Sequence, residues 1–482
     1  MVCRDSHDND FCFAFVDADG GERLFTSAQV EYMVHAVSAR FGRAIAQGSD
    51  AIVVDLPNCP LFVCVLLACA RTGLALVALN HRLSEDEKSL RLAQLEGKLN
   101  VGVVVDERWR RAFEESVRVE RASAAHMPAG RASFEGRPAG ALEAADPDAL
   151  ALVMFTSGTT GVSKAVQLTW GQLIASANAA NDSLGCDGDS LWQAVLPLYH
   201  IGGLQVVLRS FLAECSFVLY ARCDAGRLLD DATRFGATHL SVVDKILQDL
   251  VSADAGRRIP VLSAYRCLLL GGAALNERTL AAARRAHARV YASYGMTETA
   301  SLVACSLVDD SFDGGLRLLA GTEARLIAPD GDGTGELSLR GLSICRGYLN
   351  ATMRRTDGGF FLTGDRARVV DGLLYVSERV GDMFVSGGEN VYPAEVERCI
   401  DEVEGVSACY VFGMPDEVWG RRPVAVVESA SDPELVEVMV KAHVADHLAG
   451  FCRPERIVVV PRMPRSGIGK IDRAAARALA GC

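Results

Sequence analysis

The 482-residue sequence predicts an α/β protein with a large N-terminal domain, residues 1–380, and a small α+β C-terminal domain, residues 381–482. Three observations lead to this prediction. The chain is longer than a single hydrophobic core normally organises. Short apolar runs alternate with amphipathic stretches, as in layered α/β folds. Residues 322–340 then change to short strands with Gly-Asp turns, which predicts a small β-subdomain within the large domain.

The first part of the chain supplies the clearest alternation. Strands are expected at residues 51–56, 74–79 and 101–105, all three of them buried, with helices at 60–71 and 83–95 between them. Strand–helix alternation of this kind predicts a parallel sheet that is covered by helices on both faces.

The alternation continues after one interruption. Residues 122–147 are rich in Ala, Gly and Pro and are expected to form a surface connection. Further strands are expected at residues 150–155, 191–196, 217–220, 239–243 and 267–270. Beyond a boundary near residues 379–382, we expect helices at 393–401 and 433–447, strands at 408–413 and 424–427, and a final loop at 462–470.

The composition argues against several classes of protein. With 49 basic and 61 acidic residues the formal charge is -12, whereas general nucleic-acid binding needs a concentrated positive surface. The first ten residues lack the basic-then-apolar pattern of a signal peptide. The most apolar stretch, residues 61–70, is about half a bilayer span. We therefore expect a cytoplasmic protein without membrane insertion.

Cysteine is frequent, but its pattern is not that of a disulfide framework. The 15 cysteines are odd in number and form no CxxC pair. Cys59, Cys64 and Cys69 recur at intervals of five in an apolar, helix-like run. The pattern predicts reduced, structural thiols rather than disulfides or metal ligands.

The strongest chemical signal is the loop TSGTTGVSK at residues 156–164, directly after the strand expected at 150–155. Two glycines and four hydroxyl residues in its first six positions offer amides and hydroxyls that can wrap phosphate oxygens. Lys164 adds a positive charge. The GxxxxGK[ST] spacing of a Walker loop is absent. Taken alone the segment could be an ordinary turn, but strand, loop and lysine follow the order that phosphate binding requires.

A second motif, YGMTET at residues 294–299, follows a short apolar stretch at 290–292. Tyr294, next to a glycine, can stack on a purine, Thr297 can bond a phosphate, and Glu298 can hold Mg²⁺. By itself such a segment is usually a loop.

Two weaker motifs lie further along the chain. Thr363-Gly364-Asp365 places a carboxylate at an expected strand-end turn, where it can accept both hydroxyls of a ribose. RSGIGKIDR at residues 465–473 places Lys470 in a Gly-rich loop near the C-terminus. Each of these alone is typical of a surface turn and a solvated lysine.

In this order and at these separations, the motifs resemble those of the acyl-adenylate-forming superfamily, which includes acyl-CoA synthetases, adenylation domains of peptide synthetases and firefly luciferase. The resemblance extends over essentially the whole chain. Further stretches that carry it are PLYHIGG at 197–203, LLLGGAAL at 268–275 and SERVGDMFVSGGENVYPAEVE at 377–397. It implies an enzyme that uses ATP and Mg²⁺ to activate a carboxylic acid as its acyl-AMP and then passes the acyl group to coenzyme A.

The resemblance also implies roles for single residues. The phosphates of ATP are assigned to Thr156, Ser157, Gly158, Thr159, Thr160 and Lys164. The adenine is assigned to Gly271, Gly272, Ala273, Tyr294 and Gly295, and the ribose to Asp365 and Arg379. The catalytic set is Lys470, Glu298, Thr297 and His200, and the metal is assigned to Glu298 and Thr159. His200 is alternatively a packed pocket-wall residue that transfers no proton.

The same resemblance implies a mobile C-terminal domain. Asp382 matches the family's hinge, about which the small domain rotates between the two half-reactions. After rotation, the loop of Gly387, Gly388, Glu389 and Asn390 replaces Lys470 at the site and helps to form the pantetheine tunnel. The chain departs from the pattern at Ser163, where Pro is usual, and at Ala165, where Gly is common. Ser163 is expected to loosen the loop without removing a phosphate donor.

The identity of the acid is less well marked. Within the superfamily, the chain is most similar to the o-succinylbenzoate–CoA ligases of menaquinone synthesis, through LPLYHIGGL at 196–204, THLSVVDKIL at 238–247 and YRCLLLGGAAL at 265–275. That acid carries a second carboxylate, and the nearby cations in the sequence are Arg209, Lys245 and Arg266.

Three alternatives stay open at this point. They are a ligase for another aryl or medium-chain acid, a stand-alone adenylation enzyme that loads a carrier protein, and a non-catalytic nucleotide-binding protein. The expected partners are the small-molecule acid, ATP and CoA, not nucleic acid, and a homo-oligomer is compatible with the sequence.

Overall fold

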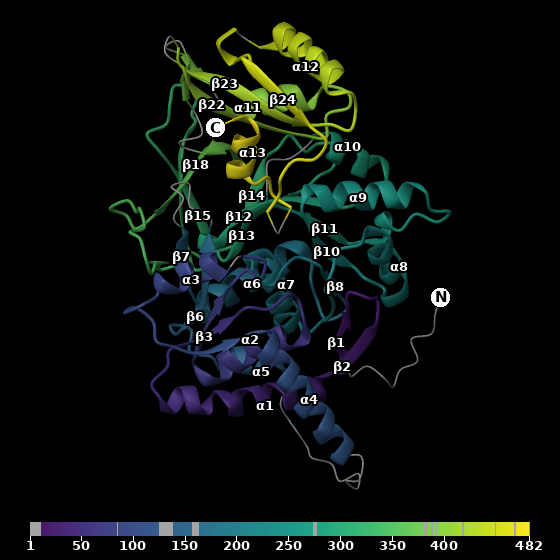
Figure 1. The fold of residues 1–482 in the computed structure, drawn as a ribbon, viewed down its shortest axis with the longest axis vertical. Helices are drawn as coiled ribbons and strands as arrows, with labels where there is room; N and C mark the ends of the chain where they lie inside the picture. Colours follow the sequence, from purple (N-terminus) through teal and green to yellow (C-terminus); the bar gives the residue numbers. More distant parts are fainter. Residues whose placement is uncertain are drawn as a thin grey trace.

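The computed structural model describes residues 11–83, 85–124, 138–156, 163–272, 277–379, 384–386, 389–391, 393–416, 419–448, 450–466 and 469–481. Within these ranges the strands form sheets of thirteen, six and five strands. The two larger sheets belong to the N-terminal part, and the smallest lies at the opposite end of the molecule, in the C-terminal part (Figure 1).

The six-stranded sheet has the order β17-β7-β6-β4-β3-β5. Its strands are β3 (Ala51–Val54), β4 (Ala75–Ala78), β5 (Val101–Val105), β6 (Leu150–Thr156), β7 (Lys164–Thr169) and β17 (Gly347–Tyr348). The strands β3, β4, β5 and β6 are parallel, as predicted. The expectation that β5 is buried is wrong. It lies at the edge of the sheet and alternates exposed with less exposed residues, and the side chain of Val104 is 46% exposed.

The first five helices are α1 (Ser27–Ala46), α2 (Pro60–Thr72), α3 (Glu85–Ala93), α4 (Glu107–Ala124) and α5 (Pro138–Glu143). Helix α2 begins with Pro60 in its first turn and ends at Gly73, which adopts a left-handed conformation with φ 75°. It is apolar on all sides and buried from Pro60 to Ala70, because it packs between α1, α5 and a strand. Cys59, Cys64 and Cys69 are buried there, as predicted.

The predicted surface connection at residues 122–147 is only partly correct. Helix α4 continues into it as far as Ala124, and α5 occupies residues 138–143. Leu142 of α5 is fully buried because α5 packs on α2. Residues 125–137 lie outside the described ranges.

The thirteen-stranded sheet has the order β15-β16-β18-β19-β14-β13-β12-β11-β10-β8-β9-β1-β2. Its first strands are β1 (Phe11–Val16), β2 (Glu22–Thr26), β8 (Leu191–Ala194), β9 (Ser216–Tyr220), β10 (His239–Val242), β11 (Cys267–Leu270) and β12 (Val290–Met296). The others are β13 (Ser301–Leu307), β14 (Leu316–Leu318), β15 (Thr322–Ile327), β16 (Gly335–Gly341), β18 (Phe361–Val370) and β19 (Leu373–Arg379). The run from β1 through β9, β8, β10 and β11 to β12 is parallel, and the strands beyond β12 pair antiparallel. The predicted β-subdomain is this antiparallel end.

The next five helices along the chain are α6 (Trp170–Leu184), α7 (Ile201–Leu212), α8 (Ala225–Phe235), α9 (Asp244–Ala255) and α10 (Glu277–Arg285). One hydrophobic core joins residues of α2, α6 and α7 to strands of both larger sheets. A second core joins α8, α9 and α10 to the thirteen-stranded sheet. Both large sheets are therefore held as one body by helices, as expected for a layered α/β domain.

The C-terminal domain has its own core and sheet. Its strands are β20 (Phe384–Ser386), β21 (Glu389–Val391), β22 (Ala408–Asp416), β23 (Gly420–Glu428) and β24 (Arg456–Val460). Its helices are α11 (Pro393–Asp401), α12 (Pro433–His447) and α13 (Arg473–Leu479). The predicted bounds of α11 and α12 are confirmed. Figure 1 shows a loop between β24 and α13 that descends from this domain toward the N-terminal one.

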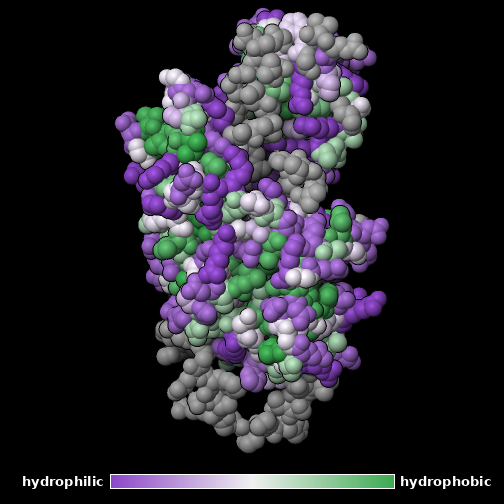
Figure 2. All heavy atoms as spheres, turned by 90° about the vertical axis from the view of Figure 1, so that its left-hand side faces the viewer, coloured by the Kyte–Doolittle hydropathy of each residue, from purple (hydrophilic) through white to green (hydrophobic). Residues whose placement is uncertain are grey.

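The surface is mixed in character. Figure 2 shows hydrophilic and hydrophobic residues interspersed over one face of the large domain. None of the helices in the described ranges combines the length and apolar character needed to cross a bilayer.

Candidate active site

The predicted site residues gather where the parallel strands β10, β11 and β12 end. In open α/β sheets, ligands commonly bind outside the carboxyl ends of parallel strands. Gly271 and Gly272 follow β11, and the YGMTET segment occupies the end of β12 and the turn after it. Ser293 Oγ donates to the carbonyl of Leu270 at 2.8 Å and fastens these two strand ends together.

The phosphate-loop candidate connects β6 to β7. Thr156 pairs directly with Lys164, so the two ends of the loop are neighbours in an antiparallel ladder. Ser157, Gly158, Thr159 and Thr160 lie outside the described residues.

Asn350, which the sequence analysis missed, holds the segment where the loop enters β7. Its Oδ1 accepts from the amide of Ala165 at 2.8 Å, and its Nδ2 donates to the carbonyl of Ser163 at 2.7 Å. The usual proline is absent at Ser163, but this residue is held by a side-chain amide instead. A lone Asn carries no local signal of such a role.

The YGMTET segment forms a tight turn after β12. Gly295 is required there, because a Cβ atom at this position would lie 1.9 Å from the carbonyl oxygen of Ser301. The hydroxyl of Thr299 accepts from the amide of Met296 at 2.9 Å and locks the turn. Thr297 is the first residue of the turn, and Glu298 is held inward with 8% of its surface exposed.

Glu298 is joined to the phosphate loop by a residue that the sequence analysis also missed. The phenol of Tyr348 donates to Glu298 Oε1 at 2.9 Å, and Lys164 Nζ lies 5.0 Å from the centroid of the Tyr348 ring. A buried carboxylate at the hydroxyl of Tyr348 and a cation over its ring thus contact the same side chain. A carboxylate beside a phosphate loop is the usual protein ligand of a Mg²⁺ ion that also binds phosphates.

Tyr294 and Asp365 come together across the sheet. The phenol of Tyr294 donates to Asp365 Oδ2 at 2.6 Å, although the two residues are 71 positions apart in sequence. The expectation that Asp365 sits in a strand-end turn is wrong, because it lies within β18. Gly364 has φ 77° and interrupts the pairing with β16, so an irregularity inside the strand, rather than its end, aims the carboxylate. Arg379 pairs with Asp365 in the register of β18 and β19, and its side chain lies outside the description.

The C-terminal domain contributes Lys470 to the same place. Gly272 has φ 96°, and a Cβ atom at Gly272 would lie 3.2 Å from Lys470 Cε. A Cβ atom at the neighbouring Gly469 would lie 3.3 Å from Cγ2 of Val243, the residue just after β10. The bridge between Arg465 and Ile471 closes the loop that carries Lys470. The structure therefore brings Lys470 to the predicted adenine segment. Ala273 lies outside the described residues.

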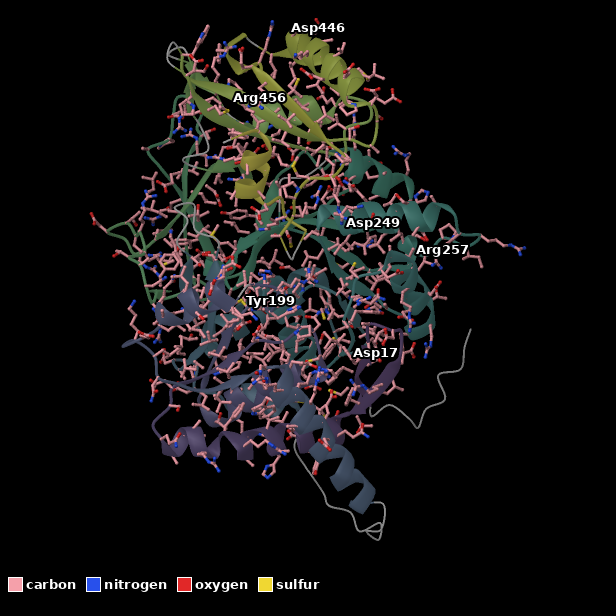
Figure 3. All side chains as sticks on the ribbon, viewed as in Figure 1. Asp17, Tyr199, Asp249, Arg257, Asp446 and Arg456 are labelled. Atoms are coloured by element: carbon pink, nitrogen blue, oxygen red, sulfur yellow. The ribbon has the colours of Figure 1, made fainter. Side chains whose placement is uncertain are left out.

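His200 caps the start of α7 on the same side of the site. It follows Tyr199, which Figure 3 labels near the centre of the molecule. Its Nε2 is buried and has no hydrogen-bond partner among the residues that the structure describes. Burial, and then the positive charges of Lys470 and Arg82, lower the pKa of His200 to about 4. The imidazole is therefore neutral at physiological pH.

Of the three cations considered for a second substrate carboxylate, two are surface residues with partners. Lys245 Nζ pairs with Asp249 on α9 at 2.6 Å, and Arg266 pairs with Asp187 at 3.4 Å. Arg209 on α7 differs, because only 1% of it is exposed. In the described part of the chain its Nε has no hydrogen-bond partner, and its Nη2 makes one long bond of 3.4 Å to Ser301 Oγ.

The predicted hinge, Asp382, and the glycines Gly387 and Gly388 lie outside the described residues. The described site therefore combines a cation from a second domain, a buried carboxylate beside a phosphate-loop lysine, and a tyrosine–aspartate pair. Such a site can hold a nucleotide and neutralise charge that develops at a phosphate.

Comparison with known proteins agrees with this geometry. Residues 6–349 match the AMP-binding enzyme family, and residues 395–470 match the AMP-binding enzyme C-terminal domain. The chain belongs to the AMP-binding enzyme family. The predicted family, fold class and enzyme class are confirmed, and the protein is an AMP-forming ligase.

Relatives in this family carry one recurrent name. A 2-succinylbenzoate–CoA ligase of Staphylococcus epidermidis is 32% identical over 68% of this chain and 69% of its own length. One from a Geobacillus species is 31% identical over 88% of this chain and 86% of its own.

Solved structures in this family share the fold. MenE, the o-succinylbenzoate CoA synthetase of Bacillus subtilis, in complex with ATP and magnesium, matches with a TM-score of 0.76 and 28% identity over 96% of both chains. ATP-bound MatB of Rhodopseudomonas palustris matches with a TM-score of 0.77 and 25% identity over 98% of this chain and 97% of its own.

Proposed function

We propose that this enzyme joins a carboxylic acid to coenzyme A in two steps, with o-succinylbenzoate as the acid. In the first step the carboxylate attacks the α-phosphate of ATP, giving acyl-AMP and pyrophosphate. In the second, the thiol of coenzyme A displaces AMP, giving the thioester, AMP and a proton. The observation that carries the proposal is the position of Lys470, which belongs to the small domain and lies against Gly272 of the large one.

Lys470 is suited to the first step. A carboxylate that approaches a phosphate brings two negative charges together, so a cation at the point of attack lowers the barrier. Because burial keeps the imidazole of His200 neutral, this residue adds no positive charge of its own to that of Lys470. We assign His200 to the wall of the acyl pocket, without proton transfer.

We also propose the remaining nucleotide contacts. We assign the phosphates to Lys164, Thr297 and the loop Thr156–Thr160, the adenine to Gly271–Ala273 with Tyr294 and Gly295, and the ribose to Asp365 and Arg379. Glu298 fits a Mg²⁺ site, because it is a buried carboxylate whose Oε1 is oriented by Tyr348. With Thr159 it would hold the ion, which when bound neutralises phosphate charge.

The second step requires a different arrangement of the small domain. We assign the hinge to Asp382 and the thioester-forming segment to Gly387–Asn390. Rotation about the hinge would withdraw Lys470 and let one site perform two reactions in turn.

Two observations support o-succinylbenzoate as the acid. The relatives described above are named for that substrate. The acid also carries a second carboxylate, and Arg209 is a fully buried guanidinium that takes part in no ion pair within the described residues. A buried charge without a counter-ion is costly, so an anionic substrate group would stabilise it. Another aryl acid remains the second candidate.

The test is a panel of acids that includes o-succinylbenzoate, its monocarboxylic analogues and medium-chain acids, with pyrophosphate release as the readout. We expect o-succinylbenzoate to give the highest kcat/KM and thioester formation to require coenzyme A. If none of the acids in the panel stimulated pyrophosphate release, the assignment of the substrate would be contradicted. Transfer to a carrier protein but not to coenzyme A would indicate a stand-alone adenylation enzyme. No release and no ATP–pyrophosphate exchange would indicate a binding protein. We further propose that the enzyme acts in the cytoplasm.

A further inference from the structure

The C-terminal domain contains a second cluster of chemically competent side chains, remote from the nucleotide site. Cys399 of α11 and His443 and His447 of α12 place one potential metal-ligating atom each within 4.8 Å of one another. Within the described residues, one group of at least three His, Cys, Asp or Glu side chains has its ligating atoms this close together, and it is this one. Asp446, next to His447, lies at the end of the molecule that is farthest from the N-terminal domain (Figure 3).

The fold brings the three residues together for simple reasons. His443 and His447 are four residues apart on α12 and therefore share one face of the helix. Their rings stack with centroids 4.1 Å apart. Helices α11 and α12 pack against each other, which places Cys399 opposite this face. Only 7% of Cys399 is exposed.

The hydrogen bonds fix which imidazole nitrogens hold a lone pair. His447 Nδ1 lies 2.8 Å from the carbonyl oxygen of His443, and a carbonyl can only accept, so Nδ1 is the protonated nitrogen and Nε2 carries the lone pair. His443 Nε2 lies 3.2 Å from Glu402 Oε2. When Nε2 donates to this carboxylate, Nδ1 of His443 carries the lone pair. A histidine whose second nitrogen donates to a carboxylate or a carbonyl is typical of metal sites.

We propose that Cys399 Sγ, His443 Nδ1 and His447 Nε2 bind a Zn²⁺ ion, with Glu402 orienting His443. Two imidazoles and a thiolate suit zinc and exclude Mg²⁺ and Ca²⁺, which take oxygen ligands. Zn–N and Zn–S bonds of about 2.0–2.3 Å require the ligand atoms to lie closer together than the 4.8 Å within which the cluster places them. Binding replaces the S–H bond of Cys399 with a zinc–sulfur bond and releases one proton to solvent. Water occupies the fourth position.

The consequence concerns the small domain rather than the reaction. The ion would tie α11 to α12, and α12 lies at the end of the molecule away from the N-terminal domain (Figure 1). Ligands that bind only the folded state stabilise it by mass action. Zinc would therefore raise the thermal stability of the C-terminal domain without entering the nucleotide site.

The experiment measures Zn²⁺ binding to the full chain by competition with a chromophoric chelator, and Co²⁺ binding by absorption spectroscopy. We expect one ion per chain and a thiolate-to-cobalt charge-transfer band. Cys399→Ser and His447→Gln should each weaken binding by at least about tenfold and remove the band or shift it. Glu402→Gln should weaken Zn²⁺ binding by about 10–100-fold, because loss of the group that accepts a hydrogen bond from a metal-ligating histidine usually has an effect of this size.

Two matched controls separate the site from adventitious binding. Cys452→Ser changes another cysteine of the same core with similar burial, 8% exposed against 7%, and His35→Gln changes an exposed histidine of α1. Neither should alter Zn²⁺ affinity. His447 is exposed, so its variant should fold even if Cys399→Ser does not. The proposal is overturned if His447→Gln binds Zn²⁺ as tightly as the unaltered chain, or if the cobalt complex shows no sulfur ligation.

Discussion

The phenol of Tyr348 donates a hydrogen bond to Glu298 at 2.9 Å while its ring faces the ammonium of Lys164. This contact links the proposed metal carboxylate to the phosphate loop. Glu298 and Tyr348 are 50 residues apart in the sequence. Glu298 lies in the turn that follows β12 of the thirteen-stranded sheet, whereas Tyr348 lies in β17 of the six-stranded sheet. The tyrosine therefore orients a carboxylate that would otherwise be free to choose several rotamers.

Tyr348→Phe should raise the Mg²⁺ concentration needed for half-maximal pyrophosphate release by about tenfold to a hundredfold. The reason is the loss of a hydrogen bond to a charged group, which is worth about 1.5–3 kcal/mol. Thioester formation from supplied acyl-AMP should be nearly unchanged. Tyr375→Phe is the matched control, because Tyr375 also donates to a carboxylate, that of Asp313, on the surface. Glu298→Gln should show the same defect more strongly. An unchanged Mg²⁺ titration in both Tyr348→Phe and Glu298→Gln would remove the pair from this role.

Lys470→Ala should depress acyl-AMP formation by roughly two to four orders of magnitude, on the scale of a lost transition-state charge contact. Thioester formation from supplied acyl-AMP should remain close to normal, because the lysine is needed only in the first step. Lys245→Ala, which removes a surface lysine paired with Asp249, should affect neither step. Equal losses in both half-reactions of Lys470→Ala would contradict the two-arrangement mechanism.

Arg209→Met should lower kcat/KM for o-succinylbenzoate by about tenfold to a thousandfold, while a monocarboxylic analogue loses far less. Methionine keeps much of the volume of the buried arginine stem, so a change in selectivity would report the charge rather than the packing. Arg266→Met removes an exposed arginine of the same region and serves as the control. A uniform loss across all acids would indicate that Arg209 supports the fold instead of recognising the substrate.

The pH dependence of stability should reflect the neutral state of His200. Its pKa is about 4 in the folded protein and near its usual 6.5 in the unfolded chain. The unfolded state therefore binds more protons between these values, and the free energy of unfolding falls as the pH drops from about 7 to 4. His200→Gln should reduce this acid sensitivity by about 1–3 kcal/mol, measured by denaturant unfolding at pH 7.5 and 5.

A second measurement on the same variant tests the role in chemistry. If His200 only lines the pocket, the pH profile of pyrophosphate release should keep its shape between pH 6 and 8 in His200→Gln, even where its height falls. Disappearance of a limb in that range would assign proton transfer to His200. His287 lies just after α10, and His287→Gln is the control for the loss of an imidazole elsewhere in the protein.

Local patterns in the sequence were sufficient for much of the fold. Helices α11 and α12 and strand β5 have the predicted bounds, because apolar periodicity and flanking Pro or Gly residues act within a few positions. The burial of β5 was predicted wrongly for a related reason. A run of valines indicates a strand, whereas its place at the edge of the sheet depends on how distant strands are ordered.

By itself, the sequence determined the parts of the candidate site that have local signatures: the loop expected after β6, the turn at Thr297–Thr299, the glycines after β11 and the lysine near the C-terminus. These residues are recognisable because their chemistry needs glycine, hydroxyl and charge at close spacing. Only the tertiary structure decided that Tyr348 orients Glu298, that Asn350 holds Ser163, and that Arg209 is buried while Lys245 and Arg266 are not. Each of these facts joins segments far apart in the chain, and such contacts are set by sheet register and helix packing, which no short stretch of sequence contains.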